Sequence, residues 1–344
     1  MSNSAGRTYR VVQWTTGNVS RQAVRAILDR PDLELVGVYA FSKDKVGTDV
    51  GELAGLDTAV GVVATDDIDA IVALEPDCVL YMPLHPDIDH LAQLLEAGIN
   101  VLTTASFLTG RAYGEEARTR LDAAAHTGGG SLCGSAVNPG FADYLAAVAS
   151  GVSRHVDYVR VIESFDIGMW AGDANQDELG WGRPAGDPGH PADIERATAP
   201  FGDAVEALAE LLGAAVDTIR CEVEFAHATT DLSVPNRTVP AGTGAGIDAK
   251  WFGAKDGQDR IEVDVRWAIT PNLDPAWEIA MAYLIEVRGH PQVNLRAEVL
   301  PQDFESMSLE EMLAIGSVIT AMPVVNAIPA VVAARPGIVT YADL

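Results

Sequence analysis

One stretch near the start of the sequence, from Tyr9 to Leu28, constrains the fold more than any other. Its first half, up to Trp14, is apolar and rich in β-forming residues, and its second half has the spacing of an amphipathic helix. Gly17 lies in the turn between them. A strand, a glycine turn and a helix in this order predict a phosphate cradle, because free N–H groups and the positive dipole end of the helix attract an anion. We therefore predict that the chain binds a dinucleotide.

The turn departs from the usual G-x-G-x-x-G fingerprint. Thr15, Gly17 and Ser20 occupy the three glycine places, so only the middle glycine, where the backbone meets the pyrophosphate, is present. Ser20 is small enough for close packing of helix on strand, and Thr15 closes the turn with some strain. An ordinary turn without a ligand is the alternative. The residues that we assign to the cradle are Thr15, Thr16, Gly17, Asn18 and Val19.

Length and charge limit the classes of partner. The chain has 344 residues, enough for two domains, and its 23 basic and 49 acidic residues give a formal charge of −26. Such a charge repels nucleic acid and anionic membranes, but a local cradle can still hold an anionic cofactor. The apolar run 321–334 is interrupted by Pro323, Asn326 and Pro329, so we expect no membrane span.

Cysteine and histidine usage points to a reducing cytoplasm and to no metal. Cys78, Cys133 and Cys221 are too widely spaced for a zinc cluster or a disulfide framework. The seven histidines include no pair with the spacing of a helical zinc site. We therefore expect a cytoplasmic protein without a metal site.

Strand-like and helical segments alternate from Leu33 to Val137, a pattern typical of an α/β domain with a doubly wound parallel sheet. Ligands of such sheets bind beyond the carboxyl ends of the strands. Asn138 has a second interpretation, since Asn before Pro139 can cap a following helix. The residues expected near the cofactor are Met82, Pro83, Leu84, His85, Thr103, Thr104, Ala105, Ser106, Asn138 and Pro139.

The end of the second strand bears on the choice of cofactor. An NAD site usually places an acid about 20 residues beyond the glycine turn, but this chain has Ala40 and Phe41 there. Ser42, Lys43 and Lys45 follow. Serine and lysine would hold a 2′-phosphate that an acid would repel, so we predict that NADP(H) is preferred and NAD(H) possible. Ser42 and Lys43 are assigned to the phosphate and Phe41 to the adenine; solvated loop charges are the alternative.

From His155 onward the pattern changes to clustered strands, which predict an open, mostly antiparallel sheet in a second, α+β domain. A long Gly-, Asp- and Pro-rich segment, 168–190, carries Trp170 and Trp181 and suggests a lid over an apolar ligand. A last helix is expected at 309–320. We place the dinucleotide-binding domain at 1–142 and the substrate and dimerisation domain at 143–319, with the tail from about 320 to 344 returning to the first domain.

Two carboxylates end the first strand of the second domain. Glu163 and Asp166 stand where a two-domain dehydrogenase would present residues to the nicotinamide. A surface or sheet-edge carboxylate is the alternative for both.

Several stretches resemble a known family. Gly47-Thr48-Asp49-Val50-Gly51-Glu52-Leu53-Ala54-Gly55 is similar to the loop after the second strand of dihydrodipicolinate reductase. The whole chain resembles that enzyme's relatives, the 2,4-diaminopentanoate dehydrogenases and native amine dehydrogenases, through residues 13–19, 137–141, 326–329 and 336–337. The resemblance implies a Rossmann domain, a second α+β domain, a homodimer and NAD(P)-dependent hydride transfer to the carbon of a C=N bond formed from a ketone and ammonia.

The chain departs from these families at their catalytic positions. Ser106 and Phe107 stand where the amine dehydrogenases have paired glutamates, and Phe165, Asp166 and Ile167 stand where dihydrodipicolinate reductase has histidines. Serine cannot supply the negative charge that a cationic imine needs. Either Asp166 or Glu163 replaces the lost carboxylate, or the substrate is a neutral carbonyl, or catalysis has decayed.

We therefore predict an NAD(P)-dependent oxidoreductase of the amine-dehydrogenase-like group that acts on a small, partly apolar molecule. The alternatives are an ammonia-independent carbonyl or imine reductase and a degenerate NADP-binding regulatory protein. Asp166 is the expected electrostatic catalyst, and Ser106 is expected to hydrogen-bond a carbonyl oxygen. The remaining residues assigned to the substrate pocket are Phe107, Phe141, Glu163, Trp170, Trp181 and Asn326.

Overall fold

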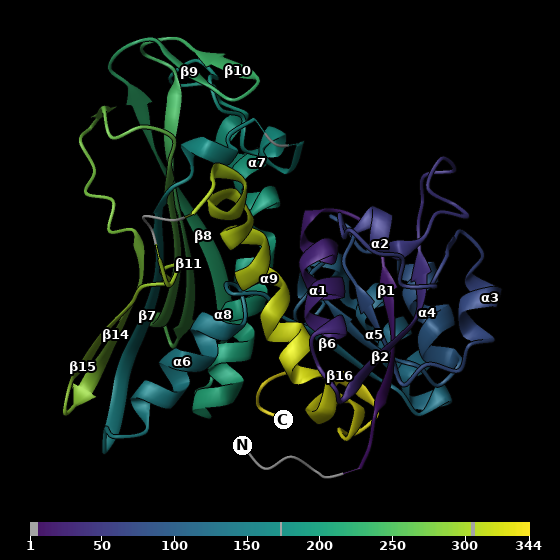
Figure 1. The fold of residues 1–344 in the computed structure, drawn as a ribbon. Helices are drawn as coiled ribbons and strands as arrows, with labels where there is room; N and C mark the ends of the chain where they lie inside the picture. The colour runs from purple at the N-terminus through teal and green to yellow at the C-terminus, as the bar shows by residue number, and fades with distance from the viewer. Residues whose placement is uncertain (1–5, 173, 304–306) are drawn as a thin grey trace. The chain divides into compact units, whose positions relative to one another are not determined.

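The computed structural model describes residues 6–172, 174–303 and 307–344. The chain forms two compact units, one of Met1–Phe141 with Ser308–Leu344 and one of Ala142–Met307 (Figure 1). Each unit contains a seven-stranded sheet with helices. The predicted α/β class, with a parallel sheet followed by a mostly antiparallel one, is confirmed.

The first unit is built on a parallel sheet in which every strand pair runs in the same direction. Its order, β16-β6-β5-β4-β1-β2-β3, is the 3-2-1-4-5-6 order of a Rossmann sheet extended by one strand. The strand order reverses between β1 and β4, which makes the carboxyl edge of these strands the place for a ligand. The strands are β1 (Tyr9–Trp14), β2 (Leu33–Tyr39), β3 (Ala64–Thr65), β4 (Cys78–Tyr81), β5 (Asn100–Thr103), β6 (Ser131–Gly134) and β16 (Gly337–Val339).

Helices cover both faces of this sheet, which explains why most residues of its strands are apolar or buried. One face packs against α1 (Asn18–Leu28) and α9 (Leu309–Val332), and the other against α3 (Ile68–Val72), α4 (Ile88–Glu96) and α5 (Gly114–Gly128). The short α2 (Val50–Leu53) follows the second strand.

Helix α9 corrects the expectation of a helix that ends at residue 320. The helix continues to Val332 through Pro323 and Pro329, because its second half packs on the sheet and tertiary burial offsets the cost of the two prolines. Ala321, Val324, Val325, Ile328 and Val331 are all fully buried there. Residues 310–332 are long and apolar enough to cross a membrane by length and composition, although that test is also passed by core helices.

The second unit contains a mixed sheet of order β13-β8-β11-β12-β7-β14-β15, in which only β7 and β12 pair in parallel. Helices α6 (Phe141–Ser150), α7 (His190–Ala197) and α8 (Ala199–Leu212) accompany it, and β9 (Leu232–Val234) and β10 (Arg237–Val239) form a separate hairpin. The sheet strands are β7 (His155–Asp166), β8 (Thr218–Ala228), β11 (Gly244–Lys255), β12 (Gln258–Ala268), β13 (Leu273–Asp274), β14 (Ala282–His290) and β15 (Val293–Ala297).

The two faces of this second sheet differ in chemistry. Val161, Ala249, Val263 and Val265 are fully buried on the face that α8 covers, and Figure 1 shows α6 and α8 on that side of the strands. Because side chains alternate along each strand, the neighbouring positions face the opposite way. Those positions carry mostly charged residues.

The segment 168–190 differs from the expected lid. It contains the short helices Gly168–Trp170 and Ala174–Leu179, and Trp181 is only 5% exposed. Trp181 packs with Ala171, Leu179 and Ile194 in the core of the second unit. The segment is therefore anchored by buried side chains.

Candidate functional site

The cradle at the start of α1 leaves room for a ligand. Gly17 is the N-cap residue, with φ −78° and ψ −175°, and offers no side chain to the free N–H groups of the first turn. A methyl group placed on Gly17 would meet no atom within 4 Å. Neither the backbone angles nor the protein packing therefore requires glycine here. The space beside it is open to an anion that approaches the backbone closely.

Thr15 carries the strain that was expected of a threonine in a glycine place. Its φ is +83°, in the left-handed region that non-glycine residues rarely adopt. Two hydrogen bonds hold it there: Thr15 Oγ1 lies 2.6 Å from Ser20 Oγ and donates to the Met82 carbonyl oxygen at 3.1 Å. The threonine thus ties β1 to both α1 and the end of β4, at the point where the sheet order reverses.

Asn138 lies at the same edge of the sheet, after β6, and is 8% exposed. Its side-chain oxygen and nitrogen are both buried without a hydrogen-bond partner in the described residues, so its amide does not cap α6. An orphaned buried amide is costly unless a ligand satisfies it. A carboxamide group, such as that of nicotinamide, has the matching donor and acceptor. The residues at this edge therefore fit a dinucleotide.

The loop after β2 arranges its lysines differently from the sequence expectation. Lys43 forms an ion pair with Asp66, which raises the lysine pKa and lowers the pKa of Asp66. Lys45 instead donates to Thr16 Oγ1 in the cradle at 3.0 Å. Sequence reasoning noted Lys45 but did not assign it a role, since nothing in the sequence showed that the loop folds back onto the turn.

Phe41 is 50% exposed at the end of β2. Its ring lies 5.2 Å from Tyr39 and 6.2 Å from His90, and Tyr39 stacks on Trp14 at 3.8 Å. An exposed aromatic ring backed by buried aromatic rings suits an adenine. Nothing in the sequence indicated that His90, which belongs to α4, would lie beside Phe41.

The loop that resembles dihydrodipicolinate reductase is a structural support. Asp49 accepts hydrogen bonds from the backbone N–H groups of Gly51, Val60 and Gly61, and these bonds hold its pKa below the ordinary value. Arg25 of α1 donates to the carbonyl oxygens of Ala54 and Gly55. The loop therefore fixes α1, and with it the cradle.

Ser106 and Phe107 occupy the end of β5. Ser106 has φ +41°, and its hydroxyl donates to the Leu84 carbonyl oxygen at 3.2 Å. Phe107 is 4% exposed and belongs to the core under α4 and α5, so its ring packs inside the first unit rather than lining an open pocket. Met82 and Ala105 are also buried at this edge.

Glu163 and Asp166 lie on opposite faces of β7, because residues an odd number apart alternate. Glu163 Oε1 accepts a hydrogen bond of 3.1 Å from the Trp267 indole, on the face that α8 covers. Asp166 Oδ1 accepts one of 2.9 Å from the Gly168 N–H. One carboxylate is thus oriented by an aromatic side chain and the other by the local backbone.

Two further residues of the expected pocket lie elsewhere. Trp181 is a core residue of the second unit, as described above. Asn326 accepts a hydrogen bond of 3.2 Å from Arg30, just beyond the end of α1, and therefore sits at the edge of the sheet opposite the cradle. Phe141 is 40% exposed at the start of α6, and Trp170 is partly buried.

Comparison with known proteins identifies the family. The C-terminal domain of 2,4-diaminopentanoate dehydrogenase matches residues 196–344. An amine dehydrogenase from Streptomyces virginiae is 31% identical over 97% of this chain and 95% of its own length. The chain belongs to the amine dehydrogenase family. It is accordingly an oxidoreductase.

More distant relatives agree with this family. The 4-hydroxy-tetrahydrodipicolinate reductase of Nostoc punctiforme is 26% identical over 44% of this chain and 56% of that protein. The structure of the amine dehydrogenase from Mycobacterium smegmatis matches with a TM-score of 0.79 and 22% identity, over 98% of this chain and 96% of that one. The suspected relationship to both groups of enzymes is confirmed, and the fold is shared along the whole chain.

Proposed function

We propose that the protein is an NADP-dependent amine dehydrogenase that aminates a small, partly apolar ketone. Ammonia adds to the carbonyl carbon and water leaves, which gives an imine that is protonated to an iminium ion. A bound NADPH would supply the hydride that reduces the iminium carbon to the amine, and it would leave as NADP⁺. The open approach to Gly17, at the same edge of the first sheet as the orphaned amide of Asn138, is the observation that carries the proposal.

Asp166 is the carboxylate that we propose to stabilise the iminium charge, in place of the glutamates that the family has at Ser106 and Phe107. Its Oδ1 is held by the Gly168 N–H, so the carboxylate is fixed rather than free to turn. Glu163 is the competing candidate, held by Trp267. Comparing Asp166→Asn with Glu163→Gln separates them, since both changes remove a charge and keep the shape.

The assay follows NADPH consumption with a panel of ketones and aldehydes, with and without ammonium. We expect turnover that depends on ammonium and falls by about 100-fold or more in Asp166→Asn, as the loss of an electrostatic catalyst does. Turnover without ammonium would support a carbonyl reductase. Cofactor binding without turnover across a wide panel would support a regulatory protein. Turnover that is unchanged in Asp166→Asn but lost in Glu163→Gln would assign the electrostatic role to Glu163.

The preference for NADP rests on the loop after β2. Ser42 and Lys43 remain the proposed contacts of the 2′-phosphate, and the hydrogen bond of Lys45 to Thr16 adds a second cation beside the cradle. Because Asp66 already neutralises Lys43, we expect Lys45→Ala to weaken NADPH binding more than Lys43→Ala. Titrations of both variants with NADPH and NADH test this. Equal binding of the two coenzymes by the wild type would rule out the preference.

We also propose a cytoplasmic enzyme. Its three cysteines are free, with Cys78 and Cys133 buried, and burial raises the pKa of Cys133 to about 12. Thiols of this kind are inert and suit a reducing compartment, where nicotinamide coenzymes are also found.

A further inference from the structure

Arg21 of α1 is an exposed cation to which sequence reasoning assigned no role. It lines the same small hollow as Thr16, the second residue of the cradle, and as Val50 and Leu53 of α2. Because the Cα–Cβ bonds of a helix tilt toward its N-terminus, a long side chain in its first turns leans back toward the start of the helix. The side chain of Arg21 is therefore positioned beside the cradle.

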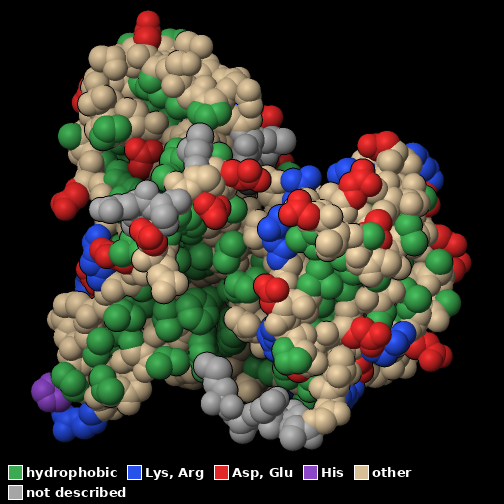
Figure 2. Space-filling view, viewed as in Figure 1, with side chains coloured by type: hydrophobic (Ala, Val, Ile, Leu, Met, Phe, Trp, Pro, Cys, Tyr) green, Lys and Arg blue, Asp and Glu red, His purple; other side chains and the backbone are tan. Residues whose placement is uncertain are grey.

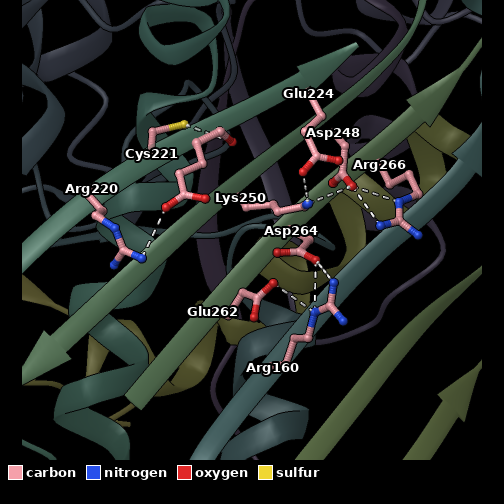
Figure 3. Close-up of polar contacts among 10 residues, drawn as sticks. Arg160, Arg220, Cys221, Glu224, Asp248, Lys250, Glu262, Asp264 and Arg266 are labelled. Atoms are coloured by element: carbon pink, nitrogen blue, oxygen red, sulfur yellow. Dashed lines mark hydrogen bonds and ion pairs between the residues drawn. The ribbon is translucent and has the colours of Figure 1, made fainter. Parts of the chain in front are cut away.

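The guanidinium of Arg21 has no ion pair and no hydrogen bond within the part of the chain that the structure describes. Elsewhere carboxylates meet the cations of this chain. Arg160, Lys250 and Arg266 of the second sheet, for example, each pair with a carboxylate, at 3.0, 2.7 and 2.7 Å (Figure 3). The chain has 49 acidic residues, yet none of those described pairs with Arg21. The guanidinium is thus available to an anion from outside the chain.

A second cation reaches the same turn from the loop after β2. Lys45 Nζ donates a hydrogen bond of 3.0 Å to Thr16 Oγ1, whereas Lys43 is held by Asp66. Thr16 therefore has one cation bonded to it and another, Arg21, lining the same hollow. The two cations come from different elements, the loop after β2 and helix α1.

This position corresponds to one part of a dinucleotide. In a Rossmann fold the pyrophosphate lies at the start of the first helix, and the adenosine ribose lies at the end of the second strand. Arg21 belongs to the first of these places and Lys45 to the second. A phosphate monoester carries a charge of about −1.5 to −2 at neutral pH, so a 2′-phosphate on this ribose needs more than one cation to balance it.

We propose that Arg21 is a specificity residue that donates to the 2′-phosphate of NADP(H) together with Lys45, and that it sets the preference for NADP(H) over NAD(H). The planar guanidinium suits this role, because its N–H groups match the oxygens of a phosphate in pairs. The inference rests on the proposed function, since it takes the cradle to hold the pyrophosphate of the coenzyme.

Titration of Arg21→Gln with NADPH and with NADH separates the 2′-phosphate from the rest of the coenzyme. We expect the dissociation constant of NADPH to rise at least about 10-fold and that of NADH to stay within about twofold. Arg21→Lys keeps the charge and should recover part of the NADPH affinity. Arg154→Gln is the matched control, because Arg154 is also exposed and also lacks an ion pair within the described residues. It should leave both constants unchanged.

Adenosine 2′,5′-bisphosphate and adenosine 5′-phosphate provide a second test that does not involve the nicotinamide. Arg21→Gln should weaken binding of the first compound only. An equal loss for both coenzymes, no loss for either, or a wild type without a preference for NADPH would overturn the role of Arg21 and leave the amine dehydrogenase proposal standing. A wild type that binds none of these ligands would overturn both.

Discussion

At the scale of single residues, Thr15 and Gly17 occupy two glycine places of the cradle for different reasons. Thr15 adopts a backbone angle that favours glycine and is held there by two hydrogen bonds. Gly17 adopts an angle open to any residue and has empty space around it. The first residue therefore serves the fold, and we assign the second to the ligand.

Gly17→Ala should separate these roles. Alanine is a poorer N-cap than glycine, so we expect the free energy of unfolding to fall by no more than about 1 kcal/mol. The added methyl group would occupy the path of the pyrophosphate, and we expect NADPH affinity to fall about tenfold or more, ~1.4 kcal/mol. Urea unfolding and coenzyme titration measure the two effects.

Gly189→Ala is the matched control, because Gly189 is the N-cap of α7 and a methyl group there would meet only ordinary contacts. It should affect stability similarly and leave NADPH binding unchanged. Unaltered binding in Gly17→Ala would remove the residue from the site.

Glu262 links stability to pH. Burial and the neighbouring Asp264 raise its pKa from 4.5 to about 8, although Arg288 acts in the opposite direction. The folded protein therefore holds a proton that the unfolded chain releases above its lower pKa. This contribution to stability is complete below the unfolded pKa and is lost as pH rises through the folded one.

Urea unfolding at about pH 5.5 and about pH 8.5 should show that the wild type loses more stability over this window than Glu262→Gln, which keeps the shape but cannot titrate. Asp264, Arg160 and Glu286 surround residue 262 in both proteins. The difference between the two pH dependences therefore reports on the carboxyl group of Glu262. Identical slopes in the two proteins would show that Glu262 is ionised in the native state.

At the scale of elements, helix α9 shows where tertiary packing overrides local signals. Its two prolines favoured an end near residue 320, yet burial of Val324, Val325 and Ile328 on the parallel sheet keeps the chain helical. The helix begins with a capping box, in which the Ser308 and Glu311 side chains bond each other's backbone N–H groups. The second half of α9 is thus part of the core of the first unit.

Ile328→Ala tests this placement. Ile328 is fully buried, and truncating such a residue costs about 2–5 kcal/mol through lost burial and the cavity left behind. Val318→Ala, at a residue 36% exposed on the same helix, should cost less than about 1 kcal/mol. Chemical denaturation compares the two. A small effect of Ile328→Ala would mean that this half of α9 is not packed on the sheet in solution.

The sequence predicted the strands and the edge at which they end, because alternation and continuous apolar runs report directly on burial. Residues such as Met82, Thr104 and Asn138 could therefore be placed at one edge from strand ends alone. Contacts between segments that lie far apart in the sequence could not be predicted. Lys45 donates a hydrogen bond to Thr16, Lys43 forms an ion pair with Asp66, and Asn326 accepts a hydrogen bond from Arg30. Each of these contacts depends on how distant segments come together. Periodicity carries no information on such contacts.

At the scale of the whole molecule, the chain combines a strongly acidic surface with a site suited to an anion. Acidic side chains are spread over the surface in view in Figure 2, in agreement with a net charge of −26. The cradle is suited to an anion because of its free backbone N–H groups and the helix dipole. Local structure, rather than net charge, therefore determines the partners that we propose.

Everything proposed for catalysis depends on the cradle holding a nicotinamide dinucleotide. Isothermal titration calorimetry of the purified full chain with NADPH, NADP⁺, NADH and NAD⁺ tests this most directly. We predict saturable binding at one site per chain, tightest for NADPH. The absence of binding by all four coenzymes would contradict the account.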